Sequence, residues 1–521
     1  MIKIFDRLRM HLSILVGLVC LSGLRLLKRQ ASSLPGYLMQ KVDPNILAKL
    51  ANNKKIIAVT GTNGKTTTAM FIYDFLKLSG EDCYINGSGA NLSSGLCTSL
   101  LIGRKKSVFV LEVDEACFAK VAFSLAPYVV LVTNLFRDQL DRYGELDAVY
   151  NFILSGLKKI PNTRLLLCAD DPKVSYLAKD SGHDRDKVFY FGKDFRLSGQ
   201  INGEVIANLD YPGCYDELVS NSIENSKDCS SSNENFDSSS AAALMASIDV
   251  AICPNCGHKL SYAAKSVAQL GNFICNKCSY RRASIDYAFS YERDGVFSIR
   301  RTQELIESGK LSTIYRRNKN IAEHCAVKAP LDGLYNAYNL AAAVAAADLS
   351  TDNTISKMLE ACKGMEARFG RQERIRLNNG KEICFILVKN PTGYSQALQL
   401  IASATDLGGI AFLLNDNPPD GEDVSWIWDI PFETIKVPET KYVLISGARY
   451  EDLALRLSYW GLEITDDNIC AEEYACSSCI NLIDRIPENT CLYILPNYTS
   501  LLRLRRELTE ALGLSSKWVK E

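Results

Sequence analysis

An apolar, β-branched run that breaks into glycines and then into Lys-Thr-Thr constrains this chain most. Residues 56–60 predict a strand, residues 61–64 a tight loop, and residues 69–78 a helix. Backbone N–H groups of such a loop and of the helix N-terminus surround phosphates, while a lysine supplies charge and a threonine hydroxyl binds magnesium. The spacing differs from the ordinary P-loop, which has an earlier glycine. We therefore expect phosphate binding by Gly61, Thr62, Asn63, Gly64, Lys65, Thr66 and Thr67.

The pattern of apolar runs predicts two α/β domains. A chain of 521 residues is too long for one core. Apolar runs alternate with helical patterns from residue 55 to about 170, which is typical of a parallel sheet: Ile56–Thr60, Val108–Val113, Tyr128–Thr133 and Leu165–Cys168. A helix is predicted at Tyr335–Leu349, and a second α/β pattern follows: Ile383–Val388, Ile410–Asn415, Tyr442–Ser446 and Leu492–Leu495. We expect an N-terminal helical, apolar segment (1–50), a central nucleotide-binding domain (51–378) and a smaller C-terminal α/β domain (379–521).

Composition excludes some classes of function. A net charge of -1, with 23% charged residues, offers no basic face for nucleic acid. Eighteen cysteines without a convincing secretory signal indicate a reducing cytoplasm and no disulfides. Residues 213–245 are rich in Ser, Asn, Asp and Glu, and we interpret them as a disordered insertion without an assigned role.

The N-terminal stretch of residues 12–24 is uncharged and mostly apolar, with Arg7 and Arg9 before it and Arg25 after it. It is shorter than a membrane-spanning helix requires. A signal peptide fits less well, because no small-residue cleavage site follows. Two other interpretations stay open: a helix packed on the body of the protein, or an amphipathic segment on the inner face of an anionic membrane.

Two CxxC pairs predict a metal site. Cys253 and Cys256 precede Cys275 and Cys278 by about twenty residues. Four thiolates at this spacing suit tetrahedral zinc, and a closed set of four leaves no position for a catalytic water. We therefore expect a structural zinc ribbon inserted in the central domain, with His258 as an alternative ligand for one cysteine.

Carboxylates follow the predicted strand 108–113. Glu112 closes this strand, and ligands of parallel sheets bind at that edge. Magnesium prefers oxygen ligands, so Glu112 and Thr66 are candidate magnesium ligands; a solvated acidic loop is the alternative. The polar segment 133–144 follows the next strand and is expected at the same edge.

At this point the chain resembles the Mur ligases, which use ATP to join an amine to a carboxylate through an acyl phosphate. The loop at 61–67 is similar to their phosphate loop, and segment 133–145 resembles a segment in which Gln139 replaces a magnesium-binding histidine. The resemblance implies Mg²⁺ and ATP, with Asn336 and Asn339 on the adenine side. It also implies that Arg371, in the Gly-Arg-Gln-Glu turn, reaches the phosphates.

Two departures narrow the resemblance to the MurT family, the ligase subunits of lipid II isoglutaminyl synthases. These are the turn at 388–393 and the four-cysteine ribbon, joined by the motif Asp-Gly-Glu-Asp-Val-Ser-Trp at 420–426. The resemblance implies a glutaminase partner, GatD, that makes ammonia, and a lipid II substrate whose D-glutamate is amidated. It assigns Asp423 to the catalytic triad of that partner, beside Lys65 and Glu112 as catalytic residues of this chain.

Alternatives remain for this motif and for the function. Asp420, Asp423 and Asp429 are also compatible with a plain surface turn, and Trp426 and Trp428 are expected as anchors in the core or at a subunit interface. The chain has four histidines, none in a glutaminase context. An amino-acid ligase of the Mur or folylpolyglutamate type, working alone, and a nucleotide-gated zinc-ribbon scaffold are the competing functions.

Overall fold

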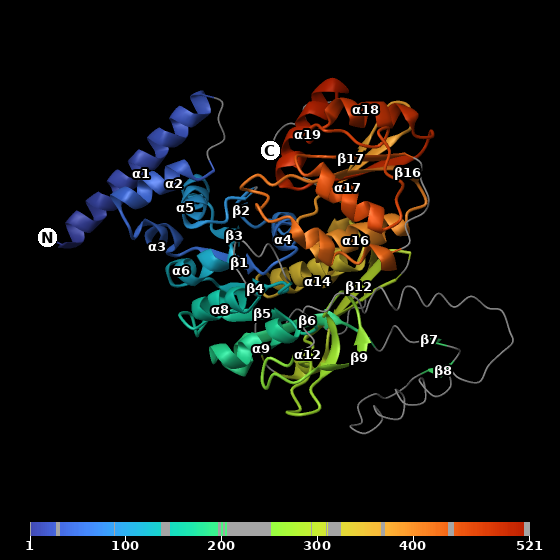
Figure 1. Cartoon of the computed structure of the whole chain (residues 1–521). Coiled ribbons are helices and arrows are strands. Elements are labelled where there is room, and N and C mark those ends of the chain that lie inside the picture. Colours follow the sequence, from blue (N-terminus) through green and yellow to red (C-terminus); the bar gives the residue numbers. More distant parts are fainter. Residues whose placement is uncertain are drawn as a thin grey trace.

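The structure is a computed structural model that describes residues 2–27, 32–87, 89–136, 146–195, 200–201, 204–205, 252–292, 294–308, 310, 325–365, 370–435 and 442–514. Two α/β units lie one above the other, and an N-terminal helix runs along one side (Figure 1). The predicted insertion at 213–245 and residue Gln139 lie outside the described residues. The prediction of an α/β chain is confirmed, because helices surround two main sheets of nine and five strands.

A nine-stranded sheet forms the centre of the first unit, in the order β13-β12-β11-β6-β5-β4-β1-β3-β2. The seven neighbouring strands from β11 to β2 in this order pair in parallel, whereas β12 pairs in antiparallel fashion with both β11 and β13. Their bounds are β1 Lys55–Thr60, β2 Cys83–Ile85, β3 Val108–Glu112, β4 Val129–Val132, β5 Arg164–Cys168, β6 Val188–Lys193, β11 Tyr287–Tyr291, β12 Val296–Arg301 and β13 Cys325–Lys328. Continuous apolar runs in β1, β3, β4 and β5 are buried, as expected for strands covered on both faces.

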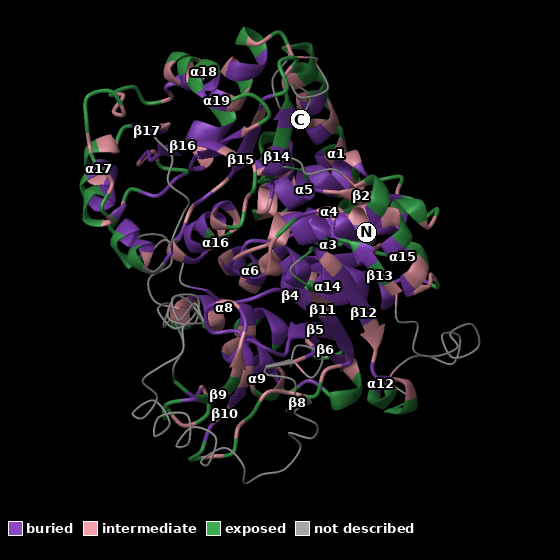
Figure 2. Ribbon diagram, turned by 90° about the vertical axis from the view of Figure 1, so that its right-hand side faces the viewer, coloured by how far each residue is buried: buried purple, intermediate pink, exposed green. Residues whose placement is uncertain are grey.

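Helices cover both faces of this sheet. One face carries α4 (Lys65–Leu78), α14 (Leu334–Asp348) and α15 (Ile355–Ala361), and α14 is buried along almost all of its length because its alanines permit close packing (Figure 2). Further helices are α5 (Ser93–Ile102), α6 (Glu115–Leu125), α8 (Leu146–Leu157), α9 (Pro172–Ser181) and α12 (Gln303–Ser308), with 3₁₀ turns η1 (Arg185–Lys187) and η2 (Cys362–Gly364).

Three N-terminal helices pack on the same unit: α1 (Ile2–Leu26), α2 (Leu34–Val42) and α3 (Ile46–Ala51). Met39, Ile46 and Leu47 belong to the main hydrophobic core, and Met10, Ile14 and Leu18 pack against it. The interpretation of the apolar start as a helix packed on the body is therefore confirmed. Among the described residues, no helix is long and apolar enough to cross a membrane.

The C-terminal unit is a five-stranded sheet in the order β14-β15-β18-β16-β17, parallel except for β14. Its strands are β14 Arg371–Arg376, β15 Glu382–Ile386, β16 Leu407–Leu413, β17 Val443–Ser446 and β18 Cys491–Leu495. The sheet thus includes residues before the expected boundary at 379. Strand β14 reads Arg-Gln-Glu-Arg-Ile-Arg and pairs only with β15, so an edge strand without an apolar run carried no signal.

Helices pack on both faces of the second sheet. Helices α16 (Pro391–Ala402) and α17 (Tyr450–Tyr459) share one core with 3₁₀ turns η3 (Ser425–Asp429) and η4 (Phe432–Thr434). Helices α18 (Cys476–Arg485) and α19 (Tyr498–Ala511) pack on the other face. A hairpin of β9 (Ser261–Lys265) and β10 (Gly271–Ile274), and a small one of β7 (Gln200–Ile201) and β8 (Glu204–Val205), lie between β6 and β11 in the chain.

Candidate active site

The phosphate loop follows β1 and leads directly into α4. Gly61 and Gly64 have φ angles of 117° and 81°, which side-chain-bearing residues rarely adopt. A Cβ on Gly61 would lie 2.5 Å from Oγ1 of Thr133, and one on Gly64 would lie 2.0 Å from Oδ1 of Asn339. Glycine is therefore required at both positions. The predicted strand, loop and helix are all present.

Residues after β4 form hydrogen bonds to the backbone of the phosphate loop. The backbone N–H of Thr62 donates to the carbonyl oxygen of Asn134, and that of Asn63 donates to Oδ1 of Asn134, both at 2.9 Å. Oγ1 of Thr133 donates to the carbonyl oxygen of Asn63 at 2.8 Å. The described part of the polar segment 133–144 thus lies at this edge of the sheet, and its role is to shape the loop.

Lys65 is held at the base of the loop. Its Nζ donates to the carbonyl oxygen of Gly61 at 2.6 Å and to Oε1 of Glu115 at 2.7 Å. Both side chains of the Lys65–Glu115 pair are nearly buried, so the carboxylate fixes the ammonium where phosphate charge would develop. Sequence reasoning did not single out Glu115 for this, although it follows Glu112 by three residues.

The candidate magnesium ligands meet at the end of β3. Oγ1 of Thr66 donates to Oε2 of Glu112 at 2.9 Å. The side chain of Asn86 bonds both backbone groups of Glu112 and so fixes this residue, with its Oδ1 accepting at 2.8 Å and its Nδ2 donating at 2.9 Å. These two hard oxygen atoms beside the phosphate loop would suit a magnesium ion. Asn86 had no sequence signal of its own.

Two buried donors at this edge have no hydrogen-bond partner among the described residues: Nδ2 of Asn63 and Nε of Arg371. Burial lowers the pKa of the Arg371 guanidinium, and the nearby negative charge of Glu112 opposes this effect. A buried donor without a partner is costly unless a ligand satisfies it. Arg371, at the start of β14, thus fits an anion such as a nucleotide phosphate.

Asn336 and Asn339 lie in the first turns of α14, and both are buried. Nδ2 of Asn336 donates to the carbonyl oxygen of Asp332 at 2.8 Å, and Nδ2 of Asn339 donates to Oδ1 of Asn336 at 3.3 Å. Asn339 also packs against Gly64, so α14 adjoins the phosphate loop. Their role in holding adenine remains a prediction.

Asn390 joins the C-terminal unit to the phosphate loop. Its Nδ2 donates to Oδ1 of Asn63 at 2.9 Å, while its Oδ1 accepts from the N–H of Gly393 at 2.8 Å as the N-cap of α16. This residue was absent from the predicted site. A sequence signal for this residue exists, because Asn390 lies in the 388–393 turn, which served only as evidence for the family resemblance.

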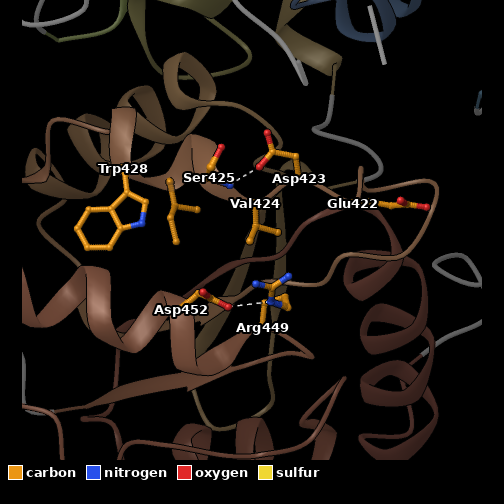
Figure 3. Close-up of a pocket in the computed structure, with 8 residues that line it drawn as sticks. Glu422, Asp423, Val424, Ser425, Trp428, Arg449 and Asp452 are labelled. Atoms are coloured by element: carbon orange, nitrogen blue, oxygen red, sulfur yellow. Dashed lines mark hydrogen bonds and ion pairs between the residues drawn. The ribbon is translucent and has the colours of Figure 1, made fainter. Parts of the chain in front are cut away.

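A second region of interest is the loop before η3, where Asp423 lines a pocket of about 240 Å³ (Figure 3). The carboxylate of Asp423 accepts a hydrogen bond from the N–H of Ser425 at 2.8 Å. The side chain and backbone of Ser425 lower the pKa of Asp423, so it is ionised at neutral pH. On the other side of the pocket, Nε of Arg449 donates to Oδ2 of Asp452 at 2.7 Å.

The other residues of this loop differ in burial. Asp420 is buried and accepts from the N–H of Thr499 at 2.9 Å, so it ties the loop to α19. Trp426 is buried in the core, as expected. Trp428 is 47% exposed and meets Tyr459 edge to face. The prediction that Trp428 lies in the core is therefore wrong, and its place at a subunit interface stays a prediction.

The four cysteines of the two CxxC pairs come together beside the β9–β10 hairpin. Their sulfur atoms all lie within 4.8 Å of one another, and the Cys253–Cys278 and Cys256–Cys275 distances are both 3.6 Å. Zinc bound tetrahedrally to thiolates at ~2.3 Å requires sulfur atoms about 3.8 Å apart. The arrangement fits zinc, whereas His258 lies outside the cluster.

Two family profiles match the chain: "Mur ligase middle domain" over residues 59–207 and "MurT ligase C-terminal" over residues 387–501. A Streptococcus pneumoniae (strain R6) protein named "Lipid II isoglutaminyl synthase (glutamine-hydrolyzing) subunit MurT" is 31% identical over 490 residues, which cover 92% of each chain. A Staphylococcus aureus (strain COL) protein of the same name is 27% identical over 492 residues, which cover 94% of this chain and 95% of that protein.

Solved structures agree in fold. A pseudomurein peptide ligase type C from Methanothermus fervidus has a TM-score of 0.57 at 18% identity, covering 91% of this chain and 84% of that chain. MurF from Acinetobacter baumannii has a TM-score of 0.56 at 15% identity, covering 91% of this chain and 80% of that chain. With the sequence matches over nearly the whole length, the chain belongs to the MurT family of Mur-type ligases.

Proposed function

We propose that this protein is the ligase subunit of a lipid II isoglutaminyl synthase. It uses ATP to amidate the α-carboxyl of D-glutamate in lipid II, giving D-isoglutamine for peptidoglycan, with ammonia from a GatD-like glutaminase partner. The observation that carries the proposal is the pairing of two sites. At the edge of the central sheet, a glycine loop with Lys65, Thr66 and Glu112 is suited to phosphate and magnesium, and Asp423 lines an open pocket on the second domain.

The phosphate site suits the activation of a carboxylate. An oxygen of the acceptor carboxylate attacks the γ-phosphorus of ATP, and ADP leaves with the electrons of the broken P–O bond. Ammonia then attacks the acyl carbon, inorganic phosphate leaves with the electrons of the C–O bond, and a proton passes to water. Lys65, the α4 N-terminus and Arg371 stabilise the phosphoryl charge. Magnesium, when held by Thr66 and Glu112, neutralises charge on the phosphates.

Asp423 suits a role for the partner. A glutaminase of the cysteine type needs a base that activates its thiol, and a carboxylate behind an imidazole fixes its tautomer and stabilises the imidazolium. In the described residues no histidine lines the Asp423 pocket, and we infer that a partner supplies the imidazole. The exposed Trp428 beside it, in contact with Tyr459, offers an aromatic anchor for the same partner.

The remaining cofactor and location follow from the same argument. We infer that Cys253, Cys256, Cys275 and Cys278 hold one structural zinc ion, because Leu260 and Phe273 alone would give this ribbon a very small core. We infer a cytoplasmic location, because the reaction needs ATP and the zinc site needs reduced thiols. The lipid substrate would then be reached at the inner face of the membrane.

The proposal is tested with free ammonia, which bypasses the partner. Lipid II is incubated with this chain, ATP, magnesium and ¹⁵N-ammonium, and the product is analysed by mass spectrometry. We expect ¹⁵N in an amide at D-glutamate, with ADP formed in equal amount. Failure to form the amide, both here and with the partner and glutamine, would favour an amino-acid ligase or a nucleotide-gated scaffold.

A further inference from the structure

We propose that the outer face of α1 docks on an anionic membrane surface. This inference rests on the proposed function, because a lipid-linked substrate stays in the bilayer and its enzyme must work at that surface. Figure 1 shows α1 along the outer edge of the molecule, with α2 on its inner side. The argument starts from how the two faces of this helix differ.

The inner face of α1 is packed tightly. Oγ of Ser13 donates to the carbonyl oxygen of Met39 at 2.9 Å, and Leu21 is buried. At Gly17 the two helices approach so closely that a Cβ would lie 2.4 Å from Sδ of Met39. These contacts fix the rotation of α1 about its axis. The residues on its opposite face are therefore held outward by the fold.

The outer face of α1 is apolar and exposed. Ile4, Leu8, Leu12, Leu15 and Val19 are each between 54% and 66% exposed, and Leu26 at the end of the helix is 87% exposed. Their spacing of three, four or seven residues puts them on one stripe, which is about 33 Å long at 1.5 Å per residue. An apolar stripe of this length is not expected to face water without a partner.

The charges around the stripe identify the partner. Arg7, Arg9 and Arg25 are exposed, and a helical projection places Arg7 and Arg25 on one side of the stripe and Arg9 on the other. The acidic Asp6 pairs with Lys49 at 2.5 Å. Basic side chains beside an apolar stripe match the interface of an anionic bilayer, where the apolar residues enter and the cations meet lipid headgroups. A second copy of the helix would bring like charges together.

This geometry orients the axis of α1 parallel to the membrane plane. Arg7, Arg9 and Asp6 interrupt the apolar sequence near the start of α1, and none of the described helices can span a bilayer. The helix would thus lie on the surface with the body of the protein on the aqueous side. Docking then confines the search for a lipid-linked substrate to the membrane plane.

Flotation of the full chain with vesicles tests the inference. We compare the wild type with Leu8→Ser/Leu15→Ser on vesicles with 30% phosphatidylglycerol and on purely zwitterionic vesicles. Wild type should float with anionic vesicles, less with zwitterionic ones, and the double variant should bind at least tenfold more weakly. Leu78→Ser, an equally exposed leucine at the end of α4, is the matched control and should bind like the wild type. Thermal melting checks that all variants fold.

Three outcomes would overturn the inference: no flotation of the wild type, flotation of the double variant like the wild type, or loss of a concentration-dependent dimer in the double variant, which would assign the stripe to a second copy. An activity arm separates this inference from the proposed function. The double variant should amidate a soluble D-glutamyl peptide fragment normally, and lipid II in vesicles at least tenfold more slowly. If the wild type amidates neither substrate, the proposed function fails, while flotation still reports on docking.

Discussion

The phosphate loop and the Asp423 loop differ in how far this chain completes them. In the first, Lys65 is nearly buried in contact with Glu115, and Asn134 and Thr133 hold the loop by hydrogen bonds to the backbone of Asn63. In the second, the carboxylate of Asp423 accepts a hydrogen bond from the N–H of Ser425, and it lines an open pocket. A site that works within one chain is preorganised by that chain, whereas a site shared with a partner leaves groups that the partner completes.

Lys65→Ala gives the largest expected effect, because the charge on the transferred phosphoryl group would lose its fixed cation. We expect amide formation and ATP consumption to fall at least ~1,000-fold, equally with glutamine and with ammonium. The measurement is a coupled ADP assay with mass spectrometry of the product. Lys77→Ala, at the exposed end of the same helix, is the control. A scaffold that uses nucleotide only as a switch would instead keep its output in this variant.

Asp423→Asn should separate the two sites. We expect glutamine-driven amidation to fall at least about a hundredfold and ammonium-driven amidation to stay within about twofold, because the carboxylate serves only the partner's imidazole. Ser425 keeps the pKa of Asp423 below its ordinary value of 3.8. The loss of glutamine-driven activity at acidic pH should therefore reflect the titration of a group in the partner, not of Asp423. Asp429→Asn, at an exposed position of η3, is the control. Equal loss with both nitrogen sources would refute the triad role.

Cys275→Ser tests whether the central domain also depends on a metal. Replacing one of four thiolates should remove the zinc, measured as metal per chain, and lower Tm by at least about 5 °C, because the ribbon loses its main source of stability. Cys20→Ser, on α1 and outside the four-cysteine cluster, should change neither quantity. Zinc retained at one ion per chain in the Cys275 variant would show that the cysteines do not form the site.

Sequence patterns predicted the parts of the fold in which local chemistry decides the structure. Strands β1, β3, β4 and β5 are buried on both faces, so each is a continuous apolar run that stands out in the chain. Strand β14 is charged and lies at an edge, where pairing with β15 rather than its own composition makes it a strand. Strand β14 therefore belongs to the C-terminal sheet although its residues precede the predicted boundary at 379.

The candidate site shows the same division. Lys65, Thr66 and Glu112 belong to motifs whose spacing carries their chemistry, and the structure brings all three to one sheet edge. Asn86 acts through Glu112, more than twenty residues away, so only the topology reveals it. Asn390 lies in a turn that the sequence marks, but its contact with Asn63 also depends on the topology. The exposed stripe of α1 needed both kinds of information, since its apolar sequence was visible but its outward face depends on packing against Met39.

Asn390 provides the finest test of the comparison, because it belongs to the same domain as Asp423 but bonds the phosphate loop. Asn390→Ser keeps an N-cap acceptor for α16 and removes the donor to Asn63, so Tm should stay within about 2 °C. We expect kcat/KM to fall five- to tenfold with glutamine and with ammonium alike, about 1 kcal/mol of positioning. Asn390→Ala removes the cap as well and should also lower Tm by a few degrees. If activity fell only in the glutamine-driven reaction, Asn390 would serve the delivery of ammonia from the partner. A contact with the phosphate loop would then belong to the partner's function, and the proposed separation between the phosphate loop and the Asp423 loop would be wrong.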